Sequence, residues 1–171
     1  LLKVHSKHNS VLIAEHIGNS SERLGKFMPL YFSDDQVIAA RAAWVISCVA
    51  TNHPDLFAPW LKKICHHILK PGLHDAVRRN GAKVLELSVI PKRLLGVVTD
   101  TCFKLLATPA ETIATRCYCM TVLEKICRSE PDLRAELKMI INDAMPFASA
   151  GFRSRSIRTL KAIGQMDSNS S

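Results

Sequence analysis

The chain has 171 residues with 23 basic and 15 acidic side chains, which give it a formal net charge of +8. This length suits one domain or one short repeat array, and it is enough to bury an apolar core without disulfides or metals. No segment approaches the roughly 20 consecutive apolar residues that a membrane-spanning helix needs, so we expect no membrane partner. The basic excess is compatible with an acidic partner, nucleic acid included.

Apolar residues recur at helical spacing along the chain, and Gly, Pro and capping residues separate the segments. Gly18 and Gly72 suit helix ends, whereas Asp34 or Asp35 suits a helix start. No alternating pattern typical of strands stands beside them, so an all-α fold is predicted. The predicted helices lie near residues 11–17, 20–31, 35–52, 54–70, 74–88, 91–106, 109–126, 131–145 and 152–163.

The helix predicted at 35–52 is apolar around most of its circumference, so other helices should flank it on several sides. Trp44 in this helix and Trp60 in the next fall on apolar stripes, and both are expected in the core. Pro29 and Pro59 are expected to bend their helices, because the proline ring removes one backbone donor.

An arginine recurs at a regular interval and indicates an internal repeat. The intervals are 37, 38 and 37 residues, and the four copies are Arg41, Arg78, Arg116 and Arg153. A second landmark, Pro54-Asp55-Leu56, returns after two periods as Pro131-Asp132-Leu133. Units of this length that each hold two helices are typical of a stacked helical solenoid, whose units cannot bury their apolar faces alone.

The units resemble HEAT repeats, in which the second helix carries Val-Arg or an equivalent pair before a small residue. The best copy is Val77-Arg78-Arg79-Asn80-Gly81-Ala82-Lys83-Val84-Leu85. The resemblance implies an armadillo-like protein of the small bacterial type, with an all-α, right-handed α-α superhelix of about four helix pairs plus an N-terminal helix. It places one domain at 1–166, with repeats near 20–52, 54–89, 91–128 and 131–165, and a polar tail at 167–171.

In HEAT repeats the second-helix arginine commonly bonds to an aspartate of an adjoining repeat. The residue six positions before each arginine is Asp35, Gly72, Ala110 and Phe147 in turn, so only the first repeat offers an acid there. The four arginines are expected to form a row on one face. Their planar guanidinium groups either bond to neighbouring helix starts and carboxylates, or bind the phosphate or carboxylate groups of a ligand.

The last predicted helix adds to the candidate binding surface, because no acid occurs between Asp143 and Asp167 while Lys161 and several arginines do. The candidate binding residues are therefore Arg41, Arg78, Arg116, Arg153, Arg155 and Arg158.

Two short clusters contain metal-ligating residue types without a suitable spacing. Adjacent helical residues point about 100° apart and residues two apart about 200°. Neither Cys65-His66-His67 nor Cys117-x-Cys119 can therefore close around one ion. No catalytic or cofactor signature is present, so the sequence predicts no metal and no cofactor and favours a protein without enzymatic activity. The six cysteines lie in helical apolar patterns, which favours reduced thiols and a cytoplasmic location.

Two functions follow from the resemblance. One is a non-enzymatic module or scaffold that binds a protein segment on the face lined by second helices, because solenoids present extended concave surfaces. The other is a nucleic-acid-binding or DNA-repair protein similar to the HEAT-like DNA alkylation glycosylases, which hold damaged DNA in a basic cleft with an Asp and Trp residues near the lesion. No Trp and Asp set of this chain matches theirs residue by residue. A continuous basic groove would favour the second function, whereas arginines paired with acids would indicate that they bond within the protein.

Overall fold

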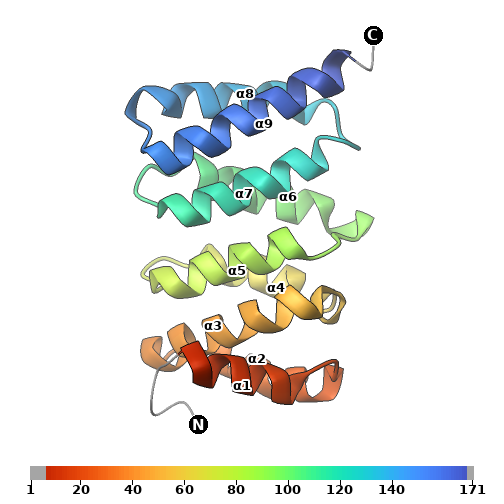
Figure 1. Cartoon of the computed structure of the whole chain (residues 1–171), viewed down its shortest axis with the longest axis vertical. Helices are drawn as coiled ribbons and strands as arrows, with labels where there is room; N and C mark the ends of the chain where they lie inside the picture. Colours follow the sequence, from red (N-terminus) through yellow and green to blue (C-terminus); the bar gives the residue numbers. More distant parts are fainter. Residues whose placement is uncertain (1–6, 169–171) are drawn as a thin grey trace.

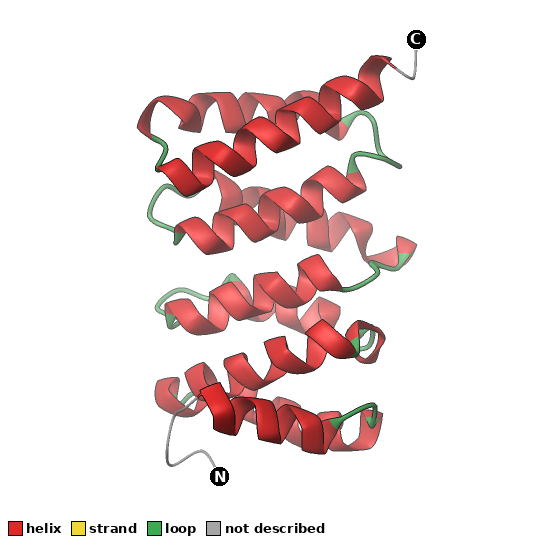
Figure 2. Cartoon of the chain, viewed as in Figure 1, coloured by secondary structure: helices red, strands yellow, loops and turns green. Residues whose placement is uncertain are grey.

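The computed structural model describes residues 7–168, and all regular secondary structure in that range is helical, as the sequence predicts (Figure 2). Short 3-10 turns lie at Pro54–Phe57, Lys92–Leu94 and Met145–Phe147. The α-helices are α1 (Lys7–Ile17), α2 (Ser21–Tyr31), α3 (Gln36–Asn52), α4 (Leu61–Ile68), α5 (Asp75–Leu87), α6 (Leu95–Ala107), α7 (Ile113–Ile126), α8 (Leu133–Ala144) and α9 (Ala150–Ser168).

The helices stack in two rows along the long axis of the molecule (Figure 1). Helices α1, α3, α5, α7 and α9 form one row, in which each helix packs against the next. Helices α2, α4, α6 and α8 form the row behind it. The pairs α2/α3, α4/α5, α6/α7 and α8/α9 therefore each contain a first helix and a second helix, and the additional helix α1 lies in the row of second helices.

Local chemistry sets the helix boundaries. The carboxylate of Asp35 accepts hydrogen bonds from the backbone N–H groups of Val37 and Ile38, so Asp35 is the N-cap of α3. Gly18 and Gly72 adopt φ values of 53° and 68°, which a residue with a Cβ rarely adopts. The expected helix end at Gly18 is thus confirmed, because α1 ends at Ile17. Gly72 instead lies in the loop after α4, which ends earlier, at Ile68.

Two of the differences between predicted and observed helices have a clear physical cause. The helix predicted at 54–70 is divided into the 3-10 turn Pro54–Phe57 and α4, and Pro59 lies between them, where its missing N–H breaks the hydrogen-bond ladder. The polar tail predicted at 167–171 begins too early, because α9 continues to Ser168. Asp167 accepts hydrogen bonds from Arg134 and Lys138 of α8, which holds that last turn in place. Residues 169–171 lie outside the described range.

The core lies between the two rows, and its largest fully buried side chains include Tyr31, Phe57 and Phe152. Each such side chain contributes about 1.5–3 kcal/mol through removal of apolar surface from water. Trp60 packs against this core, whereas Trp44 does not match the expectation of a core position. Trp44 is only partly buried and lines a surface hollow between α3 and α5.

All six cysteines lie within the described range, and none of them forms a disulfide in it. Cys65, Cys102 and Cys119 are fully buried, and burial raises the pKa of the Cys65 thiol to about 11. None of the described helices has the length and apolar character required to cross a membrane.

Candidate functional site: the surface of the second helices

The outward surface of α3, α5, α7 and α9 carries most of the residues that the sequence singles out. The first turn of each helix gives a common register. In each helix a backbone N–H donates to the carbonyl of the residue four positions earlier, and that earlier residue, directly before the helix, is the helix-opening residue. These bonds join Ala39 to Asp35, Arg78 to His74, Arg116 to Thr112 and Arg153 to Ser149.

This register corrects the predicted row of four arginines. Arg78, Arg116 and Arg153 each lie four residues after the helix-opening residue, whereas Arg41 lies six residues after Asp35. The structural equivalent of Arg78 in α3 is the buried Ala39. Two positions correspond to about 200° on a helix, so Arg41 cannot share the direction of the other three.

Arg78 is occupied by contacts within the protein. Its Nε donates to the carbonyl of Ile68, the last residue of α4, at 2.9 Å, and a terminal nitrogen donates to the carbonyl of Lys70 at 2.9 Å. The other terminal nitrogen donates to the Glu111 carboxylate at 2.7 Å, and the two side chains are only 14% and 10% exposed. Arg78 therefore satisfies helix-end carbonyls and joins two adjoining repeats through an acid.

Arg116 repeats the first of these contacts. Its Nε donates to the carbonyl of Leu106 near the end of α6 at 2.9 Å. Its guanidinium group also lies 4.3 Å from the centroid of the Phe152 ring in α9. The interpretation that these arginines bond within the protein thus fits Arg78 and Arg116, although the acceptors lie at helix ends rather than helix starts.

A hollow of about 350 Å³ lies between α3 and the start of α5. Trp44 and Arg41 line it, and the apolar side chains of Val37, Ala40 and Ala76 complete its wall. Val37 is 56% exposed, so an apolar surface is accessible there. The hollow combines an indole ring with a guanidinium group, which suits an apolar side chain next to a carboxylate.

Two side chains keep this hollow in shape. The Gln36 side chain donates to the Gly72 carbonyl at 3.0 Å and accepts from the His74 backbone N–H at 2.9 Å, so it ties α3 to the loop before α5. The guanidinium group of Arg79 lies 5.8 Å from the centroid of the Trp44 ring. The hollow is therefore preformed rather than dependent on a ligand.

Further charged residues join neighbouring second helices. Lys125 of α7 donates to the carbonyl of Glu86 in α5 at 2.5 Å. Arg155 of α9 forms an ion pair with Glu124 of α7, which also accepts a hydrogen bond from Thr159 at 2.7 Å. Arg155 thus contributes to the packing of α9 on α7.

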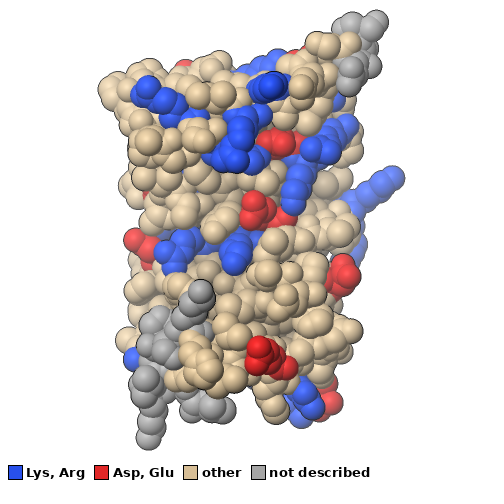
Figure 3. Space-filling model, in the orientation of Figure 1, with Lys and Arg blue, Asp and Glu red and all other residues tan. Residues whose placement is uncertain are grey.

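Three cations of α9 remain on the surface. Arg153, Arg158 and Lys161 are exposed, and none of the three forms an ion pair within residues 7–168. Arg158 donates to the carbonyl of Ser154, one turn earlier, at 3.4 Å. Figure 3 shows that Lys and Arg gather over α5, α7 and α9 on this face and are sparse over α1 and α3. The surface therefore has an aromatic end and a cationic end.

The two clusters with metal-ligating residue types separate in space. Cys65 and His67 are buried while His66 is exposed, and Cys119 is buried while Cys117 is partly exposed. No group of three potential metal ligands occurs in the described part of the chain. The His67 ring packs edge-on against Tyr31 and Phe32, and its burial lowers the pKa of its imidazole.

Sequence reasoning missed both the hollow and the acid that pairs with Arg78. Glu111 lies five residues before Arg116 rather than six, in the loop that precedes α7. Counting from the helix-opening residues instead of from the arginines would have separated Arg41 from the others and placed Trp44 on the surface.

Comparison with known proteins gives one match. A family model described as HEAT repeat domain matches residues 1–163. No curated protein and no solved structure matches the chain. HEAT repeats form helical-repeat protein-interaction modules, and the match covers all four helix pairs up to the last turns of α9.

Proposed function

We propose that this chain, which belongs to the HEAT repeat domain family, is a non-enzymatic module that binds an extended acidic segment of another protein. The segment would lie across the surface of α3, α5, α7 and α9. The observation that carries this proposal is the pair of features on that surface, the Trp44 hollow at one end and the cations Arg153, Arg158 and Lys161 at the other.

The different contacts of the arginines support this location. Arg78, Arg116 and Arg155 already bond to carbonyls, a ring or a carboxylate of the protein, so they would support the surface rather than contact the ligand. Arg158 and Arg153 would receive carboxylates of the segment. Arg41 lines the edge of the hollow together with Trp44.

The dimensions of the stack set the length of the ligand. Neighbouring helices pack about 8–10 Å apart, so the path from α3 to α9 spans about 30 Å. An extended chain advances roughly 3.3 Å per residue, so a segment of about nine or ten residues would reach from one end to the other. We expect an aromatic or aliphatic side chain near one end of it and acidic residues near the other.

Fluorescence anisotropy with two labelled peptides of this length tests the proposal. One carries a Phe near one end and Glu residues toward the other, and the matched peptide carries Lys in place of Glu. We expect the acidic peptide to bind and the variant R158E/K161E to weaken it about tenfold or more, which is about 1.4 kcal/mol. Trp44→Ala should weaken it as well.

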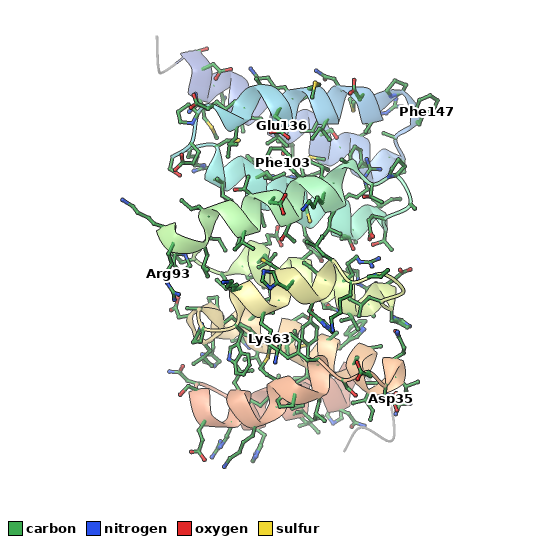
Figure 4. The ribbon with its side chains drawn as sticks, turned by 180° about the vertical axis from the view of Figure 1, so that it is seen from behind. Asp35, Lys63, Arg93, Phe103, Glu136 and Phe147 are labelled. Atoms are coloured by element: carbon green, nitrogen blue, oxygen red, sulfur yellow. The ribbon has the colours of Figure 1, made fainter. Side chains whose placement is uncertain are left out.

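The variant K92E/R93E is the control, because it makes the same change in net charge at another site. Both residues are exposed, and Arg93 projects from the edge of the stack (Figure 4). Equal losses in the two charge variants would show a general charge effect and would overturn the proposed location.

A short DNA duplex tests the nucleic-acid alternative in the same assay. Each phosphate contact should give a slope near −0.9 of log affinity against log salt concentration. The duplex could bind with submicromolar affinity at roughly 150 mM salt and lose this binding in R158E/K161E but not in K92E/R93E. That result would identify nucleic acid, and not an acidic peptide, as the ligand of this surface. Binding that disappears at this salt concentration is what any basic surface gives.

A further inference from the structure

An apolar groove lies at the first end of the stack, away from the surface described above. Its volume is about 440 Å³, and its apolar lining consists of Ile13 and Ile17 from α1 with Phe27 and Leu30 from α2. This size falls within the range of about 300–1,000 Å³ that is typical of ligand-binding pockets. Leu12, the neighbour of Ile13, is 48% exposed and extends the apolar surface of α1.

The repeat geometry indicates which shape fits this groove. Two first helices pack both against their own second helix and against the next first helix: α4 packs against α5 and α6, and α6 packs against α7 and α8. Helix α1 lies in the row of second helices, and within residues 7–168 no first helix is paired with it (Figure 1). A first helix for α1 would by the same geometry contact α1 and α2, and these two helices line the groove.

The rim of the groove indicates the charge of its occupant. The polar lining residues are His16, Arg23 and Lys26, and no acid lines the groove. Arg23 donates to the His16 carbonyl at 2.7 Å, so its guanidinium group covers the last turn of α1. Lys26 is 75% exposed, and its partner Glu22 lies one turn earlier on the same helix. An occupant with acidic flanks would meet positive charge on this rim.

We propose that the groove between α1 and α2 binds an amphipathic helix with acidic flanks, supplied by a partner protein, in the position of a first helix for α1. Helices α1 and α2 each have 11 residues. A bound helix of about three turns would therefore run along their whole length. Apolar side chains at i, i+3, i+4 and i+7 would enter the groove, and Glu or Asp beside them would face His16, Arg23 and Lys26.

The test uses the full chain and two labelled helical peptides of about three turns. Both carry Leu at i, i+3, i+4 and i+7, and one has Glu and the other Lys at the flanking positions. We expect the Glu peptide to bind about tenfold or more tightly than the Lys peptide. Amide hydrogen exchange should show added protection in α1 and α2 and none in α9.

Variants connect this binding to the groove. Phe27→Ala and the exposed pair H16E/K26E should each weaken the Glu peptide about tenfold. The control is Lys104→Glu, because Lys104 forms an equivalent exposed ion pair with Asp100 one turn away on α6. We expect this control to bind within about twofold of the unchanged protein, since a remote exposed charge contributes little.

Several outcomes would overturn the proposal. Equal affinity for the Glu and Lys peptides would show that the occupant is not selected by its acidic flanks. Equal losses of affinity in Lys104→Glu and H16E/K26E would show that the peptide does not bind in this groove. A dimer in light scattering that Phe27→Ala dissociates would identify a second copy of the chain as the occupant. A gain of about tenfold after deletion of residues 1–6 would identify the chain itself as the occupant. R158E/K161E should leave this binding unchanged, which distinguishes the groove from the surface of the second helices.

Discussion

At Gly81, helix α5 closely approaches the first helices behind it, and replacement of this glycine by Ala should destabilise the protein. An added Cβ would lie 2.5 Å from Cγ2 of Ile68 and 3.5 Å from Cγ2 of Ile64, and it would come closer still to the Tyr31 hydroxyl. Atoms of folded proteins do not approach this closely, so Ile68 and Tyr31 must both move. Tyr31 is fully buried, and its hydroxyl donates to the Val77 carbonyl at 3.2 Å.

The expected magnitude is the difference between opposing effects. Alanine has a higher helix propensity than glycine by about 1 kcal/mol, which favours the variant. Overpacking of a filled core costs about 1–3 kcal/mol. Displacement of the Tyr31 hydroxyl from its buried acceptor costs about 1–3 kcal/mol more. We therefore expect Gly81→Ala to lower the free energy of unfolding by about 1–5 kcal/mol, with the lower values if Ile68 changes its rotamer.

Denaturant unfolding followed by far-ultraviolet circular dichroism measures this change. Gly164→Ala in α9 is the matched control, because no atom lies within 4 Å of its added Cβ. This control should gain about 0.5–1 kcal/mol from helix propensity alone. The double variant Y31F/G81A should recover part of the loss, because the hydroxyl that meets the new methyl group is absent. A variant Gly81→Ala as stable as the unchanged protein would refute the close packing of α5 against α2 and α4.

Three further changes test individual contacts. Glu111→Gln should lower stability by about 1–3 kcal/mol, because Arg78 keeps its buried position and loses its carboxylate, whereas the exposed Glu130→Gln should change stability little. Trp44→Ala should lower the free energy of unfolding by less than about 3–5 kcal/mol, the loss expected for a buried Trp, because the ring lines a surface hollow. A loss within that range would show that Trp44 is a core residue. His67→Phe should reduce the loss of stability between pH 7 and pH 5. Burial lowers the pKa of His67 in the folded protein. Below about pH 6.5 this histidine therefore binds a proton in the unfolded chain but not yet in the folded protein, and stability falls as the pH falls. Parallel stability curves for the variant and the unchanged protein over this pH range would exclude His67 as the source.

The stack of helix pairs is predictable from the sequence because its causes are local. Asp35 caps α3 through its own carboxylate, and Gly18 follows the end of α1 with a positive φ value. The sequence also identifies Gly81 as the small residue of its repeat. The structure explains this residue, because the two helix layers approach so closely there that no space remains for a Cβ. Caps, glycines and apolar spacing act within one or two turns, so a single sequence contains the necessary information.

The candidate site is less predictable because its contacts cross between repeats. Arg78 reaches Glu111 across 33 residues of sequence, and the register of the loop before α7 decides which residue it meets. Arg41 shares the residue type and the approximate interval of the other arginines but lies two positions further along its helix. That shift places Trp44 beside the hollow instead of between the helix rows. A repeated residue type is therefore weaker evidence for a repeated position than a repeated cap.

Contacts of arginines at helix ends explain part of the basic character of the chain. Arginines donate to carbonyls in the last turns or at the ends of helices at four places: Arg23 to His16, Arg78 to Ile68, Arg116 to Leu106 and Arg134 to Cys127. The last carbonyls of a helix have no partner within it and carry its negative dipole end, so a cation there satisfies hydrogen bonding and charge together. Part of the net charge of +8 thus joins helices to one another, both within a helix pair and between adjoining pairs. The proposed ligand contacts use the smaller set of cations on α9, so the experiments compare charge changes at matched positions and not net charge.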